Sequence, residues 1–278
     1  MQRNAPTPVI MTLSSHDPSG CVGIQADIET SISLGCHCTP IVTALCARDT
    51  RDIKDVTAVD TGFLIEQCRA ILEDMPVKAL KIDYLANVSQ VEAVHTILKD
   101  YPHIPLVLNP ARSMANLDRR EGNAVLEAAK YLLFPATTLL CPDIVEAHQI
   151  AQQGDTIDAC AQEILEAGGD HLLISGTRRT QNTYENSLYN SQGLVRRYTW
   201  ERLSVFSHGS GATLCASIAC YLGHGLLLSD AVQQGQNFAW QSLAASRRLG
   251  MGHGVPNRLF WATSTIEGER RRGSDGGC

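Results

Sequence analysis

The amino-acid sequence alternates between short runs of β-branched and apolar residues and longer stretches with the spacing of an amphipathic helix. The first unit predicts a strand at Val9–Leu13, a polar turn over Ser14–Gly20 and a helix over Ile24–Leu34. Further strands are predicted at Thr39–Cys46, Ala79–Ile82, Leu106–Asn109, Thr138–Cys141 and His171–Ile174. Further helices are predicted at Gly62–Asp74, Ser89–Lys99 and Ala124–Leu133, and from Ile144 and Ile157 onward. Repeated strand–helix units indicate an α/β fold with a mainly parallel central sheet and helices on both faces.

The pattern changes in the last third of the chain. Asn182–Trp200 is polar with alternating Tyr, Leu and Val, which predicts a β-hairpin or meander. Gly209–Gly211 then precedes a small-residue helix from about Ala212 to Leu222, and Asp230–Leu249 predicts another helix. We expect one domain over residues 1–264, because no shift in composition divides it, and a disordered polar tail over residues 265–278.

Composition and charge narrow the classes of function. The formal net charge of −6 gives no electrostatic footprint for nucleic acid, so we expect no nucleic-acid binding. No window approaches the roughly 20 apolar residues of a membrane span, and residues 1–8 lack the apolar stretch of a signal peptide, so we expect no membrane association and a cytoplasmic location. The ten cysteines show no repeated ligand spacing, so we expect most to be reduced core residues and no metal at Cys36-His37-Cys38.

Candidate chemistry lies in the loops after the strands, because open parallel sheets bind ligands beyond the carboxyl ends of their strands. His16–Gly23 follows the first strand, and its glycines would let the backbone approach a ligand; a simple helix entry explains the segment equally well. Gly209, Ser210 and Gly211 form the segment best suited to phosphate, because backbone N–H groups are exposed where a helix begins. Close packing of the helix entry is the alternative for these glycines.

A pair of acids marks a further helix start. Asp143 and Glu146 lie three residues apart, so both carboxylates can share one face of the helix. From the residues alone, solvated acids that the helix dipole favours are the common explanation for such a pair.

Several segments together resemble one enzyme family. Asp17-Pro18-Ser19-Gly20, Gly23-Ile24-Gln25-Ala26-Asp27 and Thr43-Ala44-Leu45 resemble the opening of the hydroxymethylpyrimidine and phosphomethylpyrimidine kinases of thiamine biosynthesis, which are ribokinase-like. The resemblance continues in the same order through Lys81-Ile82, Asn109-Pro110, Cys141-Pro142-Asp143, Glu146-Ala147, His208–Leu214 and Gly252-His253-Gly254. It spans about residues 9–257 and implies a ribokinase-like three-layer sandwich.

The resemblance also implies an activity and a set of site residues. It implies a phosphotransferase that uses ATP and Mg²⁺ to transfer the γ-phosphoryl group to a hydroxymethyl or phosphate group of a pyrimidine. An anion hole for the phosphoryl group in flight would comprise Gly209, Ser210, Gly211 and Ala212. Substrate-binding positions would be Asp17, Gly20, Arg48, Tyr84 and Arg112. Nucleotide-binding positions would be Asp143, Glu146, Ser175 and Thr213, with Asp143 and Glu146 holding Mg²⁺ indirectly. Asp143 stands where the related kinases carry Asn, and its carboxylate should still suit Mg²⁺, a hard cation that prefers oxygen ligands. The resembling kinases are often dimers, so a homodimer is compatible with this assignment.

One departure from the family pattern concerns catalysis. Ala212 stands where the pyrimidine kinases carry the presumed proton acceptor, a Cys, and a methyl group cannot accept a proton. A general base contributes roughly 10²–10⁴-fold where it operates. Thr213, Cys215 and His208 are candidates to replace it. The sequence therefore leaves three hypotheses open: an active kinase, a catalytically impaired homologue that binds a small ligand or nucleotide in a regulatory role, and an interaction protein without a ligand.

Other departures alter the substrate pocket. Arg48 stands where the family has Gln, Asp83-Tyr84 replaces Gly-Met, and Asn109 and Arg112 replace an Asp and a Met. These changes add charge and bulk to a pocket for a small neutral pyrimidine. Either Arg48 or Arg112 pairs with Asp83 or Asp49, or one of the two recognises an anionic group of the substrate.

Overall fold

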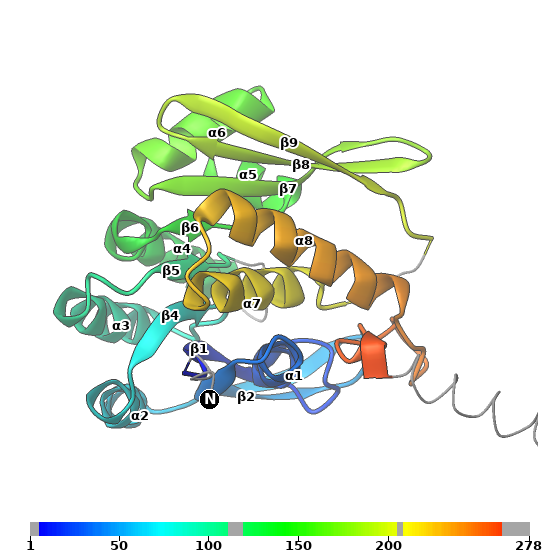
Figure 1. Cartoon of the computed structure of the whole chain (residues 1–278). Coiled ribbons are helices and arrows are strands. Elements are labelled where there is room, and N and C mark those ends of the chain that lie inside the picture. The colour runs from blue at the N-terminus through cyan, green and yellow to red at the C-terminus, as the bar shows by residue number, and fades with distance from the viewer. Residues whose placement is uncertain (1–5, 111–118, 205–207, 263–278) are drawn as a thin grey trace, which may run out of the picture.

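A nine-stranded sheet forms the centre of the computed structural model, which describes residues 6–110, 119–204 and 208–262 (Figure 1). Its strands are β1 (Val9–His16), β2 (His37–Arg48), β3 (Ile53–Ala58), β4 (Val77–Ile82), β5 (Leu106–Leu108), β6 (Leu139–Leu140), β7 (His171–Arg179), β8 (Thr183–Asn190) and β9 (Gly193–Glu201). Their order is β3-β2-β1-β4-β5-β6-β7-β8-β9. The pairs from β2 to β7 are parallel, and β3, β8 and β9 join antiparallel.

Helices cover both faces of this sheet. One face carries α1 (Gly23–Ser33), α7 (Ser210–Gly223) and α8 (Leu228–Ala244). The other carries α2 (Thr61–Asp74), α3 (Val88–Asp100), α4 (Arg119–Leu132), the 3₁₀ turn η2 (Phe134–Ala136), α5 (Ile144–Ile150) and α6 (Ile157–Glu166). Because successive strand residues point to opposite faces, Leu106 and Leu108 pack under α2–α6, whereas Val107 packs under α7 and α8. The predicted three-layer α/β sandwich is confirmed.

Most predicted elements are present, but β1 runs on to His16, through the start of the polar turn predicted at Ser14–Gly20. Three differences are larger. β3 was not predicted, because its residues are mostly exposed at the sheet edge and so carry little apolar alternation. The predicted helix ending at Leu249 stops at Ala244, because the chain turns back and Arg247 forms an antiparallel bridge with Val255. β7 extends beyond the predicted Ile174, since its second half pairs with β8 of the predicted hairpin.

Two further expectations meet the structure only in part. Every cysteine in the described part of the chain is free, and all but Cys38 are buried, as predicted for reduced core residues. Within the described ranges, no helix has both the length and the apolar character that crossing a membrane requires. The predicted tail over 265–278 lies outside the described residues, and the single-domain assignment stays a prediction.

The order of the strands creates a site at one edge of the sheet. β1 lies between β2 and β4, and the direction in which the chain adds strands reverses at β1. The loops after β1 and β4 therefore lead away from each other, and ligands of open α/β sheets bind in the crevice between such loops. Backbone pairing continues past the strand ends: the N–H of Asp83 donates to Leu13 O, that of Asn109 to Ile82 O, and that of Ser175 to Pro142 O. The residues after the parallel strands therefore lie in a row along the carboxyl edge.

Candidate active site

The loop after β1 is organised around the buried carboxylate of Asp17. Asp17 Oδ1 accepts hydrogen bonds from Ser19 N–H (2.8 Å) and Ser19 Oγ (2.7 Å), and Oδ2 accepts one from Val22 N–H (2.9 Å). Gly20 and Gly23 have φ of 72° and 71°, and a Cβ on Gly23 would lie 2.2 Å from Ser15 O. Asp17 thus shapes a tight backbone turn, and only glycine fits at its end.

Arg48 reaches this loop from the end of β2. Its Nε lies 3.7 Å from Asp17 Oδ1, and its side chain is 8% exposed. Arg48 therefore pairs with Asp17, and the hypothesis of pairing with Asp83 or Asp49 is wrong for this residue. Arg48 Nε is buried and has no hydrogen-bond partner in the described part of the chain. Arg112, the other arginine of that hypothesis, lies outside the described residues.

The glycine segment lies at the start of α7, next to the first loop. Gly209 is the N-cap with φ of 95°, and a Cβ on it would lie 1.9 Å from Cys21 O. A Cβ on Gly211 would lie 3.5 Å from Asn109 Nδ2, so the first turn of α7 also faces the end of β5. Gly209 is therefore required by close approach of two backbones, and the same turn presents a helix N-terminus to the strand ends.

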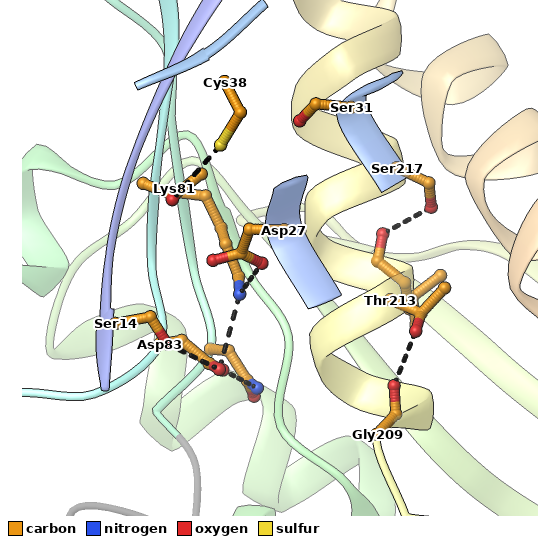
Figure 2. Close-up of polar contacts among 12 residues, drawn as sticks. Ser14, Asp27, Ser31, Cys38, Lys81, Asp83, Gly209, Thr213 and Ser217 are labelled. Carbon is orange, nitrogen blue, oxygen red and sulfur yellow. Dashed lines mark hydrogen bonds and ion pairs between the residues drawn. The ribbon is translucent and has the colours of Figure 1, made fainter. Parts of the chain in front are cut away.

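A buried ionic network joins α1 to the strand ends (Figure 2). Lys81 Nζ on β4 lies 2.6 Å from Asp27 Oδ1 of α1 and 3.4 Å from Asp83 Oδ2. Asp83 also accepts hydrogen bonds from Ser14 Oγ (3.3 Å) and Asn109 Nδ2 (2.6 Å). Burial raises the pKa of Asp27 to about 6, although Lys81 opposes the shift. Burial would lower the pKa of Lys81, but the two carboxylates raise it above its ordinary value.

Two of the predicted nucleotide residues cap the start of α5. Asp143 Oδ1 accepts from the N–H groups of Val145 and Glu146, both at 2.8 Å, and Glu146 Oε2 accepts from Asp143 N–H at 2.8 Å. This reciprocal pattern is a capping box. Ser175 on β7 forms a parallel bridge with Asp143, so the structure brings these three residues together.

The remaining predicted residues occupy different places. Thr213 is buried, and its hydroxyl donates to Gly209 O (2.7 Å) and accepts from Arg258 Nε (2.9 Å), so it faces the interior of the turn. Ala212 is 4% exposed in the same turn as Ser210 and Gly211. Tyr84 follows Asp83 after β4 and is partly buried.

The candidates to replace a base at position 212 differ in chemistry. Hydrogen bonding to Cys141 and burial raise the pKa of Cys215 well above its ordinary value, so its thiol stays protonated. The Thr213 hydroxyl is occupied. Burial, the nearby His253 and Arg48 lower the pKa of His208, so its imidazole is neutral at physiological pH. The ring centroids of His208 and His253 are 3.9 Å apart. Of the three, His208 is the one in a protonation state that can accept a proton.

The roles of two buried cations are not apparent from the sequence. Lys81 and Asp27 lie in segments that match the family, but nothing in their spacing predicts that they pair. Arg258, which is 1% exposed, contacts the first loop and α7 at once and was not singled out. An isolated arginine near the end of a domain carries no local signal of such a role.

The fold is that of the ribokinase-like small-molecule kinases. A pyridoxal kinase from Staphylococcus aureus, solved in complex with AMP-PCP and pyridoxal, superimposes with a TM-score of 0.82 at 21% identity, covering 93% of this chain and 96% of that one. The phosphomethylpyrimidine kinase family model matches residues 17–257, and the chain belongs to that family.

Relatives in sequence agree with this assignment. A hydroxymethylpyrimidine/phosphomethylpyrimidine kinase from Mycobacterium bovis is 30% identical over 91% of this chain and 94% of its own length. A thiamine biosynthesis bifunctional protein from Geobacter sulfurreducens is 29% identical over 94% of this chain, which spans only 54% of that longer protein. The chain thus spans about half the length of this bifunctional relative and nearly all of the single kinase.

Proposed function

We propose that the protein is a Mg-ATP-dependent kinase that phosphorylates hydroxymethylpyrimidine, its monophosphate, or both, in thiamine biosynthesis. The observation that carries the proposal is the position of the α7 N-terminus. Its first turn lies between the Asp17–Gly23 loop, through Gly209, and the end of β5, through Gly211, at the carboxyl edge of a sheet shared with kinases. A phosphoryl group bound there would meet backbone N–H groups and the positive end of a 14-residue helix.

Each segment then has a proposed role. Gly209, Ser210, Gly211 and Ala212 form the anion hole, and residues of the first loop bind the pyrimidine. The nucleotide is bound by Asp143, Glu146 and Ser175, and the two carboxylates hold Mg²⁺ indirectly, through its water molecules. An indirect role fits the structure, because it leaves the capping box of α5 intact. Bound Mg²⁺ would neutralise charge on the phosphates.

Ala212 bears on rate more than on the kind of reaction. Phosphoryl transfer through a loose transition state relies mainly on positioning and charge neutralisation, so a kinase can operate without a base at this position. The alternative of an impaired regulatory homologue has no support in the comparisons, whose relatives are named as kinases or thiamine-biosynthesis proteins.

The proposal is tested with wild type and Ala212→Cys. Binding of Mg-ATP and hydroxymethylpyrimidine is measured by calorimetry, and phosphorylation of hydroxymethylpyrimidine and its monophosphate is then assayed. We expect turnover by wild type and faster turnover by the Cys variant, by at most about 10²–10⁴-fold. Binding by both proteins with turnover only in the variant would favour the regulatory role, and absence of binding by either would refute the kinase proposal.

Arg48 has a proposed role in choosing the substrate. Its guanidinium is buried, its Nε lacks a hydrogen bond in the described structure, and Asp17 already accepts three hydrogen bonds from the loop. We propose that its N–H groups bind an anionic group of the substrate, which the monophosphate has and the free alcohol lacks.

The test for this role compares two substrates with Arg48→Gln, which installs the residue of the family pattern. A hydrogen bond to a charged group is worth about 1.5–3 kcal/mol, so KM for the monophosphate should rise roughly 10- to 150-fold. KM for the alcohol should change by less than about threefold. Lys54→Gln, at an exposed cation on the neighbouring strand, is the matched control. Equal changes for both substrates would contradict anion recognition.

A further inference from the structure

Arg258 connects two segments that are far apart in the sequence: the first loop with the α1 that follows it, and the first turn of α7. Its Nε donates to Thr213 Oγ1 (2.9 Å), Nη1 donates to Gly20 O (3.0 Å), and Nη2 donates to Cys21 O (2.6 Å). Nη1 also lies 3.0 Å from Glu29 Oε2 on α1. One side chain therefore binds the first loop, the first turn of α7 and α1.

The burial of this guanidinium is physically costly. Arg258 is 1% exposed, and Glu29, its one carboxylate partner among the described residues, has a side chain that is 44% exposed. Two of its acceptors are neutral carbonyls, which do not balance its charge. A buried charge of this kind is tolerated when its donors find hydrogen-bond partners, and the rigid planar guanidinium then fixes where those partners lie.

The acceptors of Arg258 are the two backbones whose approach defines the site. A Cβ on Gly209 would lie 1.9 Å from Cys21 O and 2.9 Å from Arg258 Nη2, so the loop, the helix start and the guanidinium meet at one point. The Thr213 hydroxyl links Arg258 to Gly209, because it accepts a hydrogen bond from Arg258 Nε and donates one to Gly209 O. Arg258 thus holds both sides of this contact.

The segment that carries Arg258 is itself fixed. Asn257 N–H donates to Ser242 O on α8 (3.0 Å), and Trp261 Nε1 donates to Ser33 Oγ on α1 (2.7 Å). The guanidinium is therefore held in place from its own side.

We propose that Arg258 is a positioning residue that fixes the position of the Asp17–Gly23 loop relative to the anion-hole turn of α7. This inference rests on the proposed kinase function. Arg258 lies one residue beyond the family match, which ends at 257. Displacing one loop relative to the other separates the bound pyrimidine from the phosphoryl group, and an error of about 1 Å in such an alignment costs about 10²-fold in rate.

Kinetics test the proposal with Arg258→Ala and Arg258→Lys, assayed at a temperature where circular dichroism shows both folded. We expect Arg258→Ala to lower kcat by about 10²-fold with little change in KM, because aligned binding is lost and each ligand still binds. Arg258→Lys should recover little, since the donors of an ammonium radiate from one nitrogen and cannot reach four acceptors that the three guanidinium nitrogens contact at separate points. Added methylguanidinium should restore part of the kcat of the Ala variant. Arg202→Ala, at an exposed arginine with one hydrogen bond to Thr180 O, is the control. An unchanged kcat in folded Arg258→Ala would overturn the proposal.

Hydrogen–deuterium exchange tests the connection without any activity. In Arg258→Ala, amides of residues 17–23 and 208–214 should exchange faster together, while the β8–β9 hairpin at the far edge of the sheet stays as in wild type. Faster exchange throughout the chain, or in neither segment, would show that Arg258 does not act on this contact. If wild type lacked kinase activity, the proposed function would fail while this measurement still decided the role of Arg258.

Discussion

Lys81→Met would remove the ammonium group that faces two buried carboxylates. Lys81 and Asp27 have fully buried side chains, and that of Asp83 is 9% exposed. Asp83 would keep its hydrogen bonds from Ser14 and Asn109. Asp27 would lose its closest partner, and its Oδ2 already lacks a hydrogen bond in the described part of the chain. Removing one partner of a buried ion pair costs about 3–5 kcal/mol, so we expect a loss of that size in the free energy of unfolding near pH 7.5.

The penalty should shrink on acidification. The pKa of Asp27 is raised from 3.8 to about 6 in the folded protein, so the folded state binds more protons than the unfolded chain between these values. Stability therefore falls as pH rises through this window and recovers as pH falls. Lys81 lowers this pKa relative to burial alone, so its removal moves the titration to higher pH. When the pH is lowered from about 7.5 to about 5.5, the free energy of unfolding should therefore increase more in Lys81→Met than in wild type.

Urea unfolding followed by far-UV circular dichroism measures these differences in wild type, Lys81→Met and Asp27→Asn/Lys81→Met. The double variant should recover about 2 kcal/mol or more near pH 7.5, because no carboxylate is left at position 27. It should also lose the extra pH dependence. A penalty below about 1 kcal/mol for Lys81→Met, or the same penalty at both pH values, would refute this account of the network.

Two further substitutions have matched controls. Gly209→Ala should abolish turnover and lower the free energy of unfolding by clearly more than the control Gly225→Ala, which should cost about 1–2 kcal/mol. The φ angle is positive at both sites, but only Gly209 lies against Cys21 O. Equal losses of stability in urea unfolding would contradict this reasoning. Asp143→Ala and Thr156→Ala each remove a helix N-cap, at a cost of about 0.5–2 kcal/mol in the free energy of unfolding. Only Asp143→Ala should also raise KM for ATP. A similar rise in both variants would contradict the proposed role of Asp143 in nucleotide binding.

Local patterns in the sequence were enough to predict the layers and the family. Alternation of strand and helix spacing gave the three-layer sandwich, because burial on one or both faces imposes its own period on each element. The edge strand β3 escaped this reasoning, since its mostly exposed residues have little need of a period. The helix start at Asp143 and Glu146 was predicted, but the reciprocal capping box between them was found only in the structure, because the spacing suits solvated acids as well.

The candidate site was predicted only in its parts. The sequence by itself determined which glycines and acids follow the strands, because turns and helix starts depend on neighbouring residues. Only the tertiary structure decided that Arg48 pairs with Asp17, that Lys81 lies between Asp27 and Asp83, and that Arg258 reaches Gly20 across 238 positions. Buried charges must find partners wherever the fold provides them, and no local spacing encodes a partner that the packing of distant segments brings within reach.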